Sequence, residues 1–353
     1  MGNESIEASF LSIFALISFF IFLIISKYSH LIKDGILLDN DFIKPQAFHE
    51  LPVTRSGGIA AIISLSFFFG IYYLLYSKIL YDYLLISYTM FFIGFADDIR
   101  INIKPIKRLI MMILSLFIII YFLPIKISNI DIPFLVSFLN NKLFSSLFIL
   151  LCFLFVINGS NLIDGFNGLL SINLIIINLI LTYINLNSSN LEFSIFLISQ
   201  IIILLSFLLF NFPNSKIFLG DGGAYLMGSL VGLNTIITNN LNPDISSFFF
   251  CTLLFYLFFE VFFSFFRKIF QKKSPIHPDD KHLHMLSYYI IASIYGKNKG
   301  NYLNSIFINT IYFILIIPGF HLMKDPVLSR YWFLSLLLIY IFIYVRLYRL
   351  TKN

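Results

Sequence analysis

The sequence predicts an all-α, polytopic membrane protein, and three features of its composition lead to this expectation. Of the 353 residues, 59% are hydrophobic and 12% are charged, and the mean hydropathy is +0.89. Soluble domains are typically about 45–50% apolar and about 25% charged. Leu, Ile and Phe also recur in runs of about 20 residues, the length that a helix needs to cross a bilayer. Because a backbone in lipid must satisfy its own hydrogen bonds, we expect helices and no strands.

The apolar runs predict about eleven spans within one integral membrane domain, 1–353. In order along the chain, the expected spans are 8–27, 57–76, 80–96, 108–127, 143–158, 168–186, 191–211, 223–238, 246–268, 301–320 and 331–347. The first run follows "MGNESIEASF", which has no Lys or Arg, so we expect a retained span and not a signal peptide. The polar motifs lie within about 35–290, and 291–353 holds two further spans and a tail.

The distribution of basic residues predicts the orientation of these spans. With the N-terminus outside, only five of the 24 Lys and Arg residues lie in outer loops, and 19 remain on the inner side. The five outer residues are Lys78, Lys126, Lys142, Lys324 and Arg330. The positive-inside rule therefore favours an outer N-terminus and a cytoplasmic C-terminus. The net charge of +6 is explained by this topology, and we expect no nucleic-acid partner.

Four polar stretches interrupt the apolar pattern, and each follows an odd-numbered predicted span. They read "FADDIRINIKPIKR", "NGSNLIDGFNGLL", "NSKIFLGDGGAY" and "RKIFQKKSPIHPDDKHLH". By the orientation above, all four lie on the cytoplasmic face, whereas the outer loops are short. We therefore expect a single site on the inner face.

The first stretch places Asp97 and Asp98 at the C-terminal end of the third predicted span. Acids at that end oppose the helix dipole, and a solvated helix end is the ordinary alternative. Paired carboxylates at a membrane boundary suit a divalent cation or the removal of a proton. Lys107, at the start of the next predicted helix, supplies positive charge.

In the second stretch, Asn158, Asn161 and Asp164 are spaced i, i+3, i+6 and line one helical edge. Asp164 followed by Gly165 is by itself only a turn signal. Buried amides cost free energy unless they are paired. A ligand rich in donors and acceptors, such as a nucleotide or a sugar, would pair them.

The third stretch contains Asp221, whose ordinary role at this position would be a helix N-cap. Its flanking glycines allow close approach of a ligand to the backbone. A carboxylate with Lys216 nearby suits Mg²⁺, which keeps several waters and bridges phosphate oxygens; Mn²⁺ is an alternative. Zinc is disfavoured because no cysteine lies in these loops.

The fourth stretch contains three of the six histidines, His277, His282 and His284. A solvated basic loop is the ordinary interpretation. Near neutral pH, however, imidazole can bind phosphate or give it a proton.

Together with "HELPVTRSGG" in the first inner loop, these motifs resemble a known family in order and spacing. The family is that of the polyprenyl-phosphate N-acetylhexosamine-1-phosphate transferases of glycosyltransferase family 4, in its WecA- and TagO-like branch related to MraY. The resemblance covers roughly residues 35–290, and "HPDDKHLH" favours the WecA-like branch.

The resemblance implies transfer of a sugar 1-phosphate, with GlcNAc the commonest sugar, from a UDP-sugar to undecaprenyl phosphate. It implies magnesium, release of UMP, and a place at the cytoplasmic face of the bacterial inner membrane. The reaction would begin a lipid-linked cell-surface glycan. Whether the protein forms a homodimer is left open.

The resemblance also implies roles for the acidic residues. Asp97 would deprotonate or orient the lipid phosphate, with Asp98 beside it. Asp221 would bind the metal, and Asn211, ten residues earlier, would support the metal and the diphosphate.

The remaining residues carried over from the family would bind the two substrates. Asn158, Asn161 and Asp164 would line the nucleotide pocket, and Phe218 would stack on uracil. The phosphate and sugar contacts would come from His49, Arg55, Lys107, Lys216, Asp279, His282 and His284. Asn167 departs from the pattern, since an aspartate is usual there, and it puts the ribose contact in question.

Two other functions are alternatives to the transferase. A transporter would need charges at mid-membrane depth and a repeated half, yet Glu260 is almost the only charge within the spans. A non-catalytic binder of lipid phosphate is disfavoured by the full set of acids and histidines. Magnesium-dependent release of UMP separates the transferase from both.

Overall fold

The computed structural model describes residues 2–39, 52–101, 103–275 and 279–352. Within them, the chain forms α-helices, one 3₁₀-helix and one pair of two-residue strands. In order these are α1 (Gly2–Tyr28), η1 (Ser29–Gly35), β1 (Leu38–Asp39), β2 (Val53–Thr54), α2 (Gly57–Tyr76), α3 (Tyr81–Asp98), α4 (Pro105–Phe122), α5 (Pro133–Leu139), α6 (Lys142–Ile163), α7 (Leu169–Asn187), α8 (Leu191–Asn211), α9 (Gly220–Leu241), α10 (Ser247–Leu253), α11 (Phe255–Phe270), α12 (Leu283–Tyr295), α13 (Lys297–Leu322) and α14 (Pro326–Leu350).

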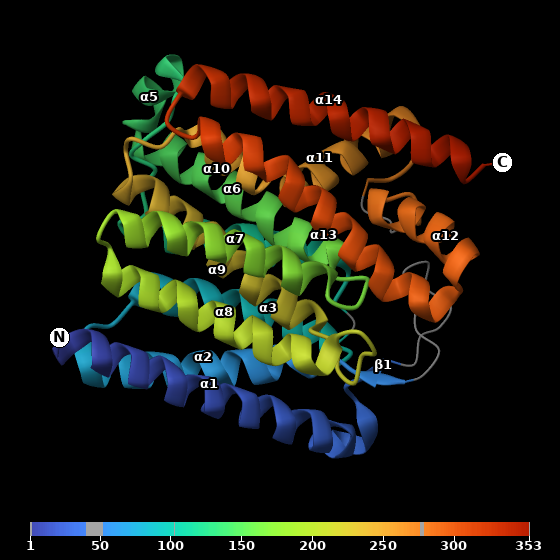
Figure 1. Ribbon diagram of the computed structural model, residues 1–353, viewed down its shortest axis with the longest axis horizontal. Helices are drawn as coiled ribbons and strands as arrows, with labels where there is room; N and C mark the ends of the chain where they lie inside the picture. The colour runs from blue at the N-terminus through green and yellow to red at the C-terminus, as the bar shows by residue number, and fades with distance from the viewer. Residues whose placement is uncertain (1, 40–51, 102, 276–278, 353) are drawn as a thin grey trace.

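The long helices lie side by side in one bundle, as Figure 1 shows. Helices α1 and α2 form one edge of the bundle in this view, and α14 forms the other. The strands and α12 lie at the right end, and α5 lies at the left end. Because α1 starts at the left end and α14 finishes at the right end, the two termini are at opposite ends of the bundle.

Helix α9 is the centre of the bundle. It packs against α2, α3, α6 and α7, and almost all of its residues are buried. Its contact with α3 is very close, because a Cβ on Gly94 would lie 2.4 Å from the backbone oxygen of Asp221. Only glycine permits this approach, which brings the end of α3 next to the start of α9.

Each predicted span overlaps helix in the structure, although the predicted span 108–127 extends beyond the end of α4 at Phe122. Among the described residues, eight helices are long and apolar enough to cross a membrane, or nine if the bent pair α10–α11 counts as one span. Helices α3 and α9 do not meet that test, although α3 has 18 residues and α9 has 22. Helix α3 ends in two aspartates and begins with a third acid, Asp82. The number of eleven spans therefore stays a prediction.

Two expectations about these elements were wrong. The expected continuous span 246–268 is broken after Leu253, where α10 and α11 meet at a bend of 74°. The segment between α11 and α13, where no span was predicted, contains the short helix α12. Strands also occur, because β1 pairs antiparallel with β2, and Thr54 forms a parallel bridge to Ile217. The β1–β2 pairing lies within the first inner loop, and the bridge from Thr54 to Ile217 attaches that loop to the loop before α9.

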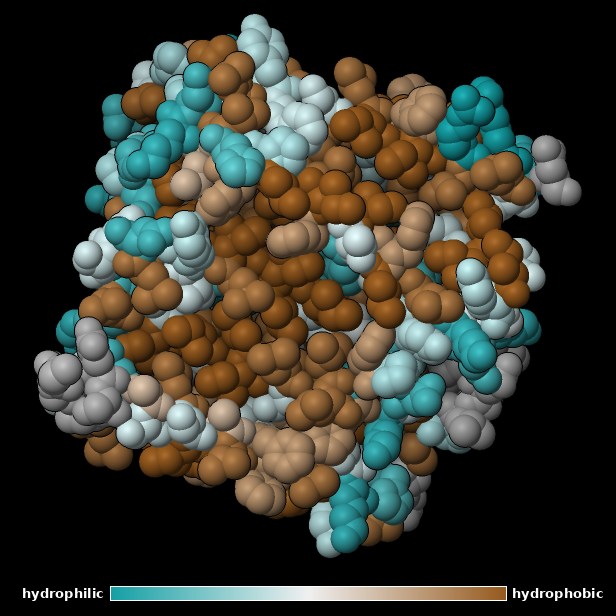
Figure 2. Space-filling view, viewed as in Figure 1, coloured by the Kyte–Doolittle hydropathy of each residue, from teal (hydrophilic) through white to brown (hydrophobic). Residues whose placement is uncertain are grey.

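The surface of the bundle has the polarity expected of a protein in a bilayer. Figure 2 shows a broad hydrophobic band across the middle of the molecule, with hydrophilic residues gathered toward the left and right ends. Large apolar side chains such as Leu74 and Phe122 are exposed, as they would be against lipid. The chain is therefore a multi-pass membrane protein.

Candidate active site

Two carboxylates and one guanidinium form the centre of the site. Arg108, in the first turn of α4, places Nη1 3.0 Å from Oδ2 of Asp97 and donates a hydrogen bond to Oδ2 of Asp221. The side chains of Asp97 and Asp221 are 32% and 20% exposed. Two acids from different helices thus converge on one cation at a point that solvent reaches.

Asp98, next to Asp97 in sequence, has a different position. Its side chain is buried, and its two oxygens accept hydrogen bonds from the backbone N–H of Asp221 (3.0 Å) and Gly222 (2.9 Å). Gly220 adopts φ +77°, and a Cβ there would lie 2.6 Å from Asp98 Oδ2. A carboxylate at a helix N-terminus is stabilised by the helix dipole. The start of α9 is therefore capped by Asp98, and not by Asp221 as the ordinary interpretation of the sequence had it.

Arg55 joins this cluster from the first inner loop. The Phe218 N–H donates to the Thr54 carbonyl, and the Gly57 N–H donates to the Phe218 carbonyl. These bonds place Arg55 2.7 Å from Asp39 Oδ2 and 3.8 Å from Asp98 Oδ1. Burial alone would lower the pKa of Arg55, but the charges of Asp221 and Asp39 raise it above its usual range. His49, expected beside Arg55, lies outside the described residues.

The end of α6 and the α6–α7 loop (164–168) form a second wall near the acids. Asn158 and Asn161 lie in the last turns of α6, Asp164 follows the helix directly, and all three are half-buried. Asn158 Nδ2 donates to the carbonyl of Leu154, one turn earlier. Burial, followed by the charges of Asp221 and Asp98, raises the pKa of Asp164. The α6–α7 loop therefore lies within electrostatic reach of the acidic cluster.

Asn211 braces the loops around the site. Its Oδ1 accepts from the N–H of Gly168 (2.7 Å), and its Nδ2 donates to the carbonyl of Ile217 (3.0 Å). Asn167 Nδ2 donates to the carbonyl of Pro213, a bond that the aspartate usual in the family could not make. Both ends of the Asn211 amide are therefore engaged by backbone, and its role as a metal ligand stays a prediction. Lys216 is exposed.

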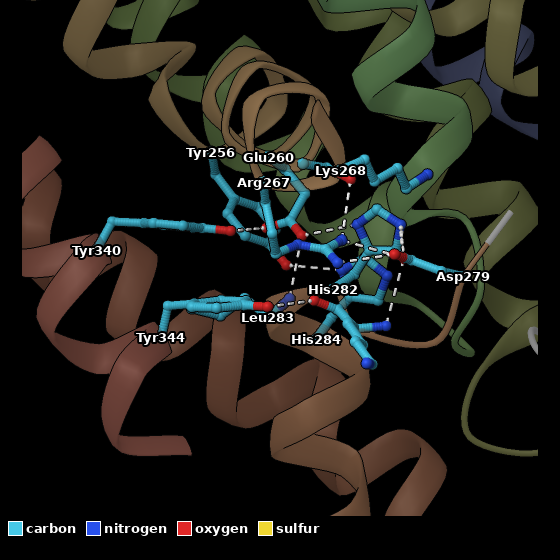
Figure 3. A network of polar contacts seen from close by, with 12 residues as sticks. Tyr256, Glu260, Arg267, Lys268, Asp279, His282, Leu283, His284, Tyr340 and Tyr344 are labelled. Atoms are coloured by element: carbon cyan, nitrogen blue, oxygen red, sulfur yellow. Dashed lines mark hydrogen bonds and ion pairs between the residues drawn. The ribbon is translucent and has the colours of Figure 1, made fainter. Parts of the chain in front are cut away.

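The histidine loop forms a separate buried network, shown in Figure 3. His282 Nδ1 lies 3.1 Å from Glu260 Oε1 on α11, and Nε2 lies 3.3 Å from Asp279 Oδ1. Arg267 donates to both oxygens of Asp279, at 2.7 and 3.1 Å. Burial would raise the pKa of Asp279, but the hydrogen bonds from Arg267 and the charge of His282 lower it.

His284 lies beside His282, with parallel rings 5.5 Å apart. Its Nδ1 is 3.3 Å from the hydroxyl of Tyr256. Its Nε2 is buried and has no hydrogen-bond partner among the residues that the structure describes. Burial lowers the pKa of His284 to about 3, so the ring is neutral. Phe166 of the α6–α7 loop contacts the His284 ring at 5.8 Å and so joins this network to the loop near the acids. Of the histidines predicted for this loop, His277 lies outside the described residues.

Sequence reasoning chose Lys107 and missed Arg108. Lys107 is exposed, whereas Arg108 contacts both acids. The signal was present, because Arg108 lies four residues before Met112 and begins the stripe that Met112, Leu116 and Ile120 continue along the buried face of α4. No comparable sequence signal identifies Asp39, the partner of Arg55, because this residue stands next to no motif and no periodic apolar run.

The donor set of the site fits a hard divalent cation completed by other ligands. Asp97 and Asp221 present carboxylate oxygens to one point, and Mg²⁺ is usually bound by one or two carboxylates with waters and phosphate oxygens. No group of three or more His, Cys, Asp or Glu side chains in the described part of the chain is arranged to enclose a metal by itself. The residues present thus fit a magnesium ion that also binds a phosphate ligand.

Comparisons with known proteins cover the central part of this site. The model of glycosyl transferase family 4 matches residues 80–239. The undecaprenyl-phosphate alpha-N-acetylglucosaminyl 1-phosphate transferase of Thermotoga maritima is 31% identical over 138 residues, which are 39% of this chain and 41% of that relative. The phospho-N-acetylmuramoyl-pentapeptide-transferase of Clostridium perfringens (strain 13 / Type A) is 32% identical over 154 residues, 41% of this chain and 49% of the relative.

The chain thus spans about half the length of the curated relatives that it matches. The phospho-N-acetylmuramoyl-pentapeptide-transferase of Clostridioides difficile (strain 630) is 26% identical over 199 residues, which are 53% of this chain and 62% of that relative. The segment matched by the family model includes Asp97, Asp98, Arg108, Asp164 and Asp221, the residues around which the acidic cluster is built. Residues 80–239 of the chain, which hold the acidic cluster, are therefore similar to glycosyl transferase family 4.

Proposed function

We propose that the protein transfers N-acetylhexosamine 1-phosphate, with GlcNAc as the first sugar to test, from a UDP-sugar to undecaprenyl phosphate. An oxygen of the lipid phosphate would form a bond to the phosphorus next to the sugar, and the bond from that phosphorus to UMP would break. The product would be a lipid-linked diphosphate sugar, the first intermediate of a cell-surface glycan. The site would face the cytoplasm of a bacterial inner membrane.

The single observation that supports this proposal best is the convergence of Asp97, Asp221 and Arg108 at the end of the bundle. Transfer between two phosphates joins anions, so a catalyst mainly has to neutralise charge and fix geometry. Arg55 and Arg108 supply positive charge there, and Asp98 fixes the position of Asp221. Of the three relatives reported above, one is named as an alpha-N-acetylglucosaminyl 1-phosphate transferase and two as phospho-N-acetylmuramoyl-pentapeptide-transferases.

Magnesium is the cofactor that we propose for this site. Asp97 and Asp221 would hold it, and it would supply Lewis-acid stabilisation of the phosphate oxygens when bound. Asp97 would also orient the lipid phosphate, and Asn158, Asn161 and Asp164 would bind the nucleotide. His284 Nε2 would donate to or accept from the sugar diphosphate, since that nitrogen lacks a partner among the described residues.

The test uses the purified full-length protein with C55 polyprenyl phosphate, Mg²⁺ and a panel of UDP-N-acetylhexosamines. UMP and lipid-linked sugar are followed for the wild type, for Asp221→Asn and for Asp244→Asn. Asp244 is an exposed aspartate paired with Lys324, so it controls for the same chemical change away from the acidic cluster. We expect product with one donor, lost with EDTA and with Asp221→Asn only. No UMP with any donor would overturn the proposal and favour a transporter or a non-catalytic binder.

A further inference from the structure

A cavity of about 700 Å³ lies at the end of the bundle where α5 is found. This is the left end of the molecule in Figure 1, and the strands beside the acidic cluster lie at the right end. Residues of the segment 120–130, of α5 and of the first turn of α6 line the cavity. Lys126 and Lys142 are among them, and no Asp or Glu of the described residues is. This cavity, the lysine cavity, is therefore suited to an anion.

Neither topology nor ion pairing explains the two lysines of this cavity. Lys126 and Lys142 belong to the five basic residues in loops that are predicted to lie outside, where Lys and Arg are scarce. Two of the other three, Lys78 and Lys324, pair with acids at 2.7 and 3.1 Å. Neither cavity lysine has an ion pair within the described part of the chain. The Lys142 ammonium lies 4.2 Å from the centroid of the Tyr121 ring, a contact that leaves its N–H groups available.

The end of α9 holds the segment that carries Lys126. Asn240 Nδ2 donates to the carbonyl of Lys126 at 2.6 Å, and Asn240 Oδ1 accepts from the N–H of Ser128 at 2.8 Å. Asn129 Nδ2 donates to the carbonyl of Ile245 at 3.0 Å. Because these bonds fix the backbone before a ligand binds, ordering the site costs little beyond the lysine side chains themselves.

A second cavity, of about 260 Å³, adjoins the lysine cavity, because Ile127 and Ile130 line both. It lies between α6, α9 and α10, and most of its walls are Ile, Leu, Val and Phe side chains. None of the described residues that line it is charged. An apolar cavity of ~150 Å³ stays dry and binds benzene. This apolar cavity therefore has room for part of a hydrocarbon chain.

One buried polar atom also lines the apolar cavity. Asn239 is 5% exposed, and its Nδ2 donates to the carbonyl of Asn129 at 3.0 Å. Its Oδ1 has no hydrogen-bond partner among the residues that the structure describes, and a buried acceptor without a donor costs free energy. Because Asn129 lies between Ile127 and Ile130 in the chain, this amide stands beside the junction of the two cavities. A ligand with a hydroxyl group near its charged group would satisfy it.

We propose that the two cavities together bind one anionic glycerophospholipid with a hydroxylated headgroup, of the phosphatidylglycerol type. In this arrangement the phosphate lies between Lys126 and Lys142, a headgroup hydroxyl donates to Asn239, and one acyl chain enters the apolar cavity. Phe122 and Val136, which line the lysine cavity and are 77% and 47% exposed, contact the second acyl chain at the surface. The lipid site is separate from the acidic cluster and does not rest on the proposed function.

The first arm of the test measures lipid affinity by native mass spectrometry of the full-length protein in detergent. We expect phosphatidylglycerol to bind more tightly than phosphatidylcholine with the same acyl chains. The double variant Lys126→Gln/Lys142→Gln should weaken phosphatidylglycerol binding about 25-fold, since one basic residue near an anionic headgroup is worth about fivefold in affinity. Lys324→Gln is the matched control, because it removes a basic residue that pairs with Asp244 and does not line the cavity.

Two results of this arm would overturn the lysine site. One is equal affinity for phosphatidylglycerol and phosphatidylcholine, and the other is a loss with Lys324→Gln as large as with the double variant. Phosphatidylmethanol tests the hydroxyl group, because it keeps the negative charge and has no hydroxyl. It should bind about fivefold more weakly than phosphatidylglycerol, the worth of one hydrogen bond. Equal affinity for these two lipids would remove Asn239 from the proposal.

The second arm locates the acyl chain. Phosphatidylglycerol with a diazirine at the end of one acyl chain is bound and illuminated, and the labelled peptides are identified by mass spectrometry. We expect labels on α6 and α10, where Cys152 and Cys251 line the apolar cavity. Labels confined to exposed residues such as Leu338 of α14 would overturn the proposal. So would labelling that excess C55 polyprenyl phosphate abolishes, because the cavity would then belong to that lipid.

Discussion

At the scale of single residues, the neighbouring basic side chains of Lys107 and Arg108 point in different directions. Lys107 points to solvent, and Arg108 reaches Asp97 and Asp221. A guanidinium has several donors in a fixed plane and can bridge two carboxylates, whereas an ammonium is a point charge. The acidic pair thus depends on the identity of this residue as well as on its charge.

We expect Arg108→Ala to lower kcat/KM for UMP release by about 100-fold or more, the usual loss on removing one preorganised electrostatic group. Without the guanidinium, Asp97 and Asp221 would repel each other and lose their alignment. Arg108→Lys should retain more activity, because it keeps the charge. Lys107→Ala is the comparison, and a loss as large as that of Arg108→Ala would contradict the assignment.

The raised pKa of Asp164 leads us to expect that the stability of the protein depends on pH. Burial and the charges of Asp221 and Asp98 raise its pKa, so its charged form is disfavoured in the folded protein. A raised carboxyl pKa contributes stability below the unfolded value, and this contribution is lost as pH rises through the folded value. Asp164→Asn should therefore raise the unfolding temperature at neutral and alkaline pH, by about 2–4 °C for each 1 kcal/mol. The gain over the wild type should vanish toward pH 3, and a gain of equal size at every pH would contradict this account.

The sequence predicted the chemistry of the site residues better than their contacts. Asp97 and Asp98 are adjacent and alike in sequence, yet one faces solvent and Arg108 while the other caps α9. Which of two neighbouring side chains points inward depends on the helix packed against them, here α9. Asp98 accepts its hydrogen bond from the N–H of Asp221, which lies 123 residues further along the chain. A local sequence pattern holds no information on a contact at that separation.

At the scale of elements, the site depends on the close packing of α3 and α9. The two helices approach at Gly94, where the backbone of Asp221 occupies the space of a side chain. The same contact sets the distance between Asp97 at the end of α3 and Asp221 at the start of α9. Stability and site geometry are therefore coupled at this glycine.

Gly94→Ala should destabilise the protein by about 1–3 kcal/mol, because the added Cβ would lie 2.4 Å from a backbone oxygen that cannot move alone. UMP release should fall with it, since α3 and α9 would separate. Gly70→Ala in α2 is the matched control, because a Cβ there meets nothing within 4 Å. We expect Gly70→Ala to be neutral or slightly stabilising. Thermal unfolding in detergent measures both, and equal effects would argue against the packing explanation.

The apolar runs located the long helices because hydrophobic length is a strong signal in a membrane protein. They did not reveal the 74° break between α10 and α11, since Leu254 lies at the break with neither Pro nor Gly beside it. Helix α12, with 13 residues, was below the length of a span. The strands β1 and β2 have two residues each and pair within the first inner loop, and the bridge from Thr54 to Ile217 joins that loop to a segment far away in the sequence. Each of these features depends on tertiary contacts.

At the scale of the whole molecule, a buried polar network joins four helices between the two ends of the bundle. Asn234 of α9 accepts from Tyr83 of α3 at 2.9 Å. It donates to Asn178 of α7 at 3.0 Å and to Gln200 of α8 at 2.7 Å. Because lipid offers no drive for apolar helices to associate, such interhelical bonds help to specify how the helices pack. The network therefore ties α9, which presents Asp221, to three of its neighbours.

Asn234→Leu should test this role of the network in the assembled bundle. The substitution keeps the approximate side-chain volume and leaves Tyr83, Asn178 and Gln200 without their shared partner. We expect the free energy of unfolding to fall by about 2 kcal/mol, because each lost interhelical bond is worth about 0.6 kcal/mol and the groups left unpaired add to the cost. Thr235→Val is the control, since the one bond of the Thr235 hydroxyl within the described residues goes to the Val231 carbonyl of its own helix. In SDS titrations, Asn234→Leu should unfold at a lower detergent fraction, and Thr235→Val should stay close to the wild type. Equal midpoints for Asn234→Leu and the wild type would mean that apolar packing alone holds α9 in the position that the acidic cluster requires.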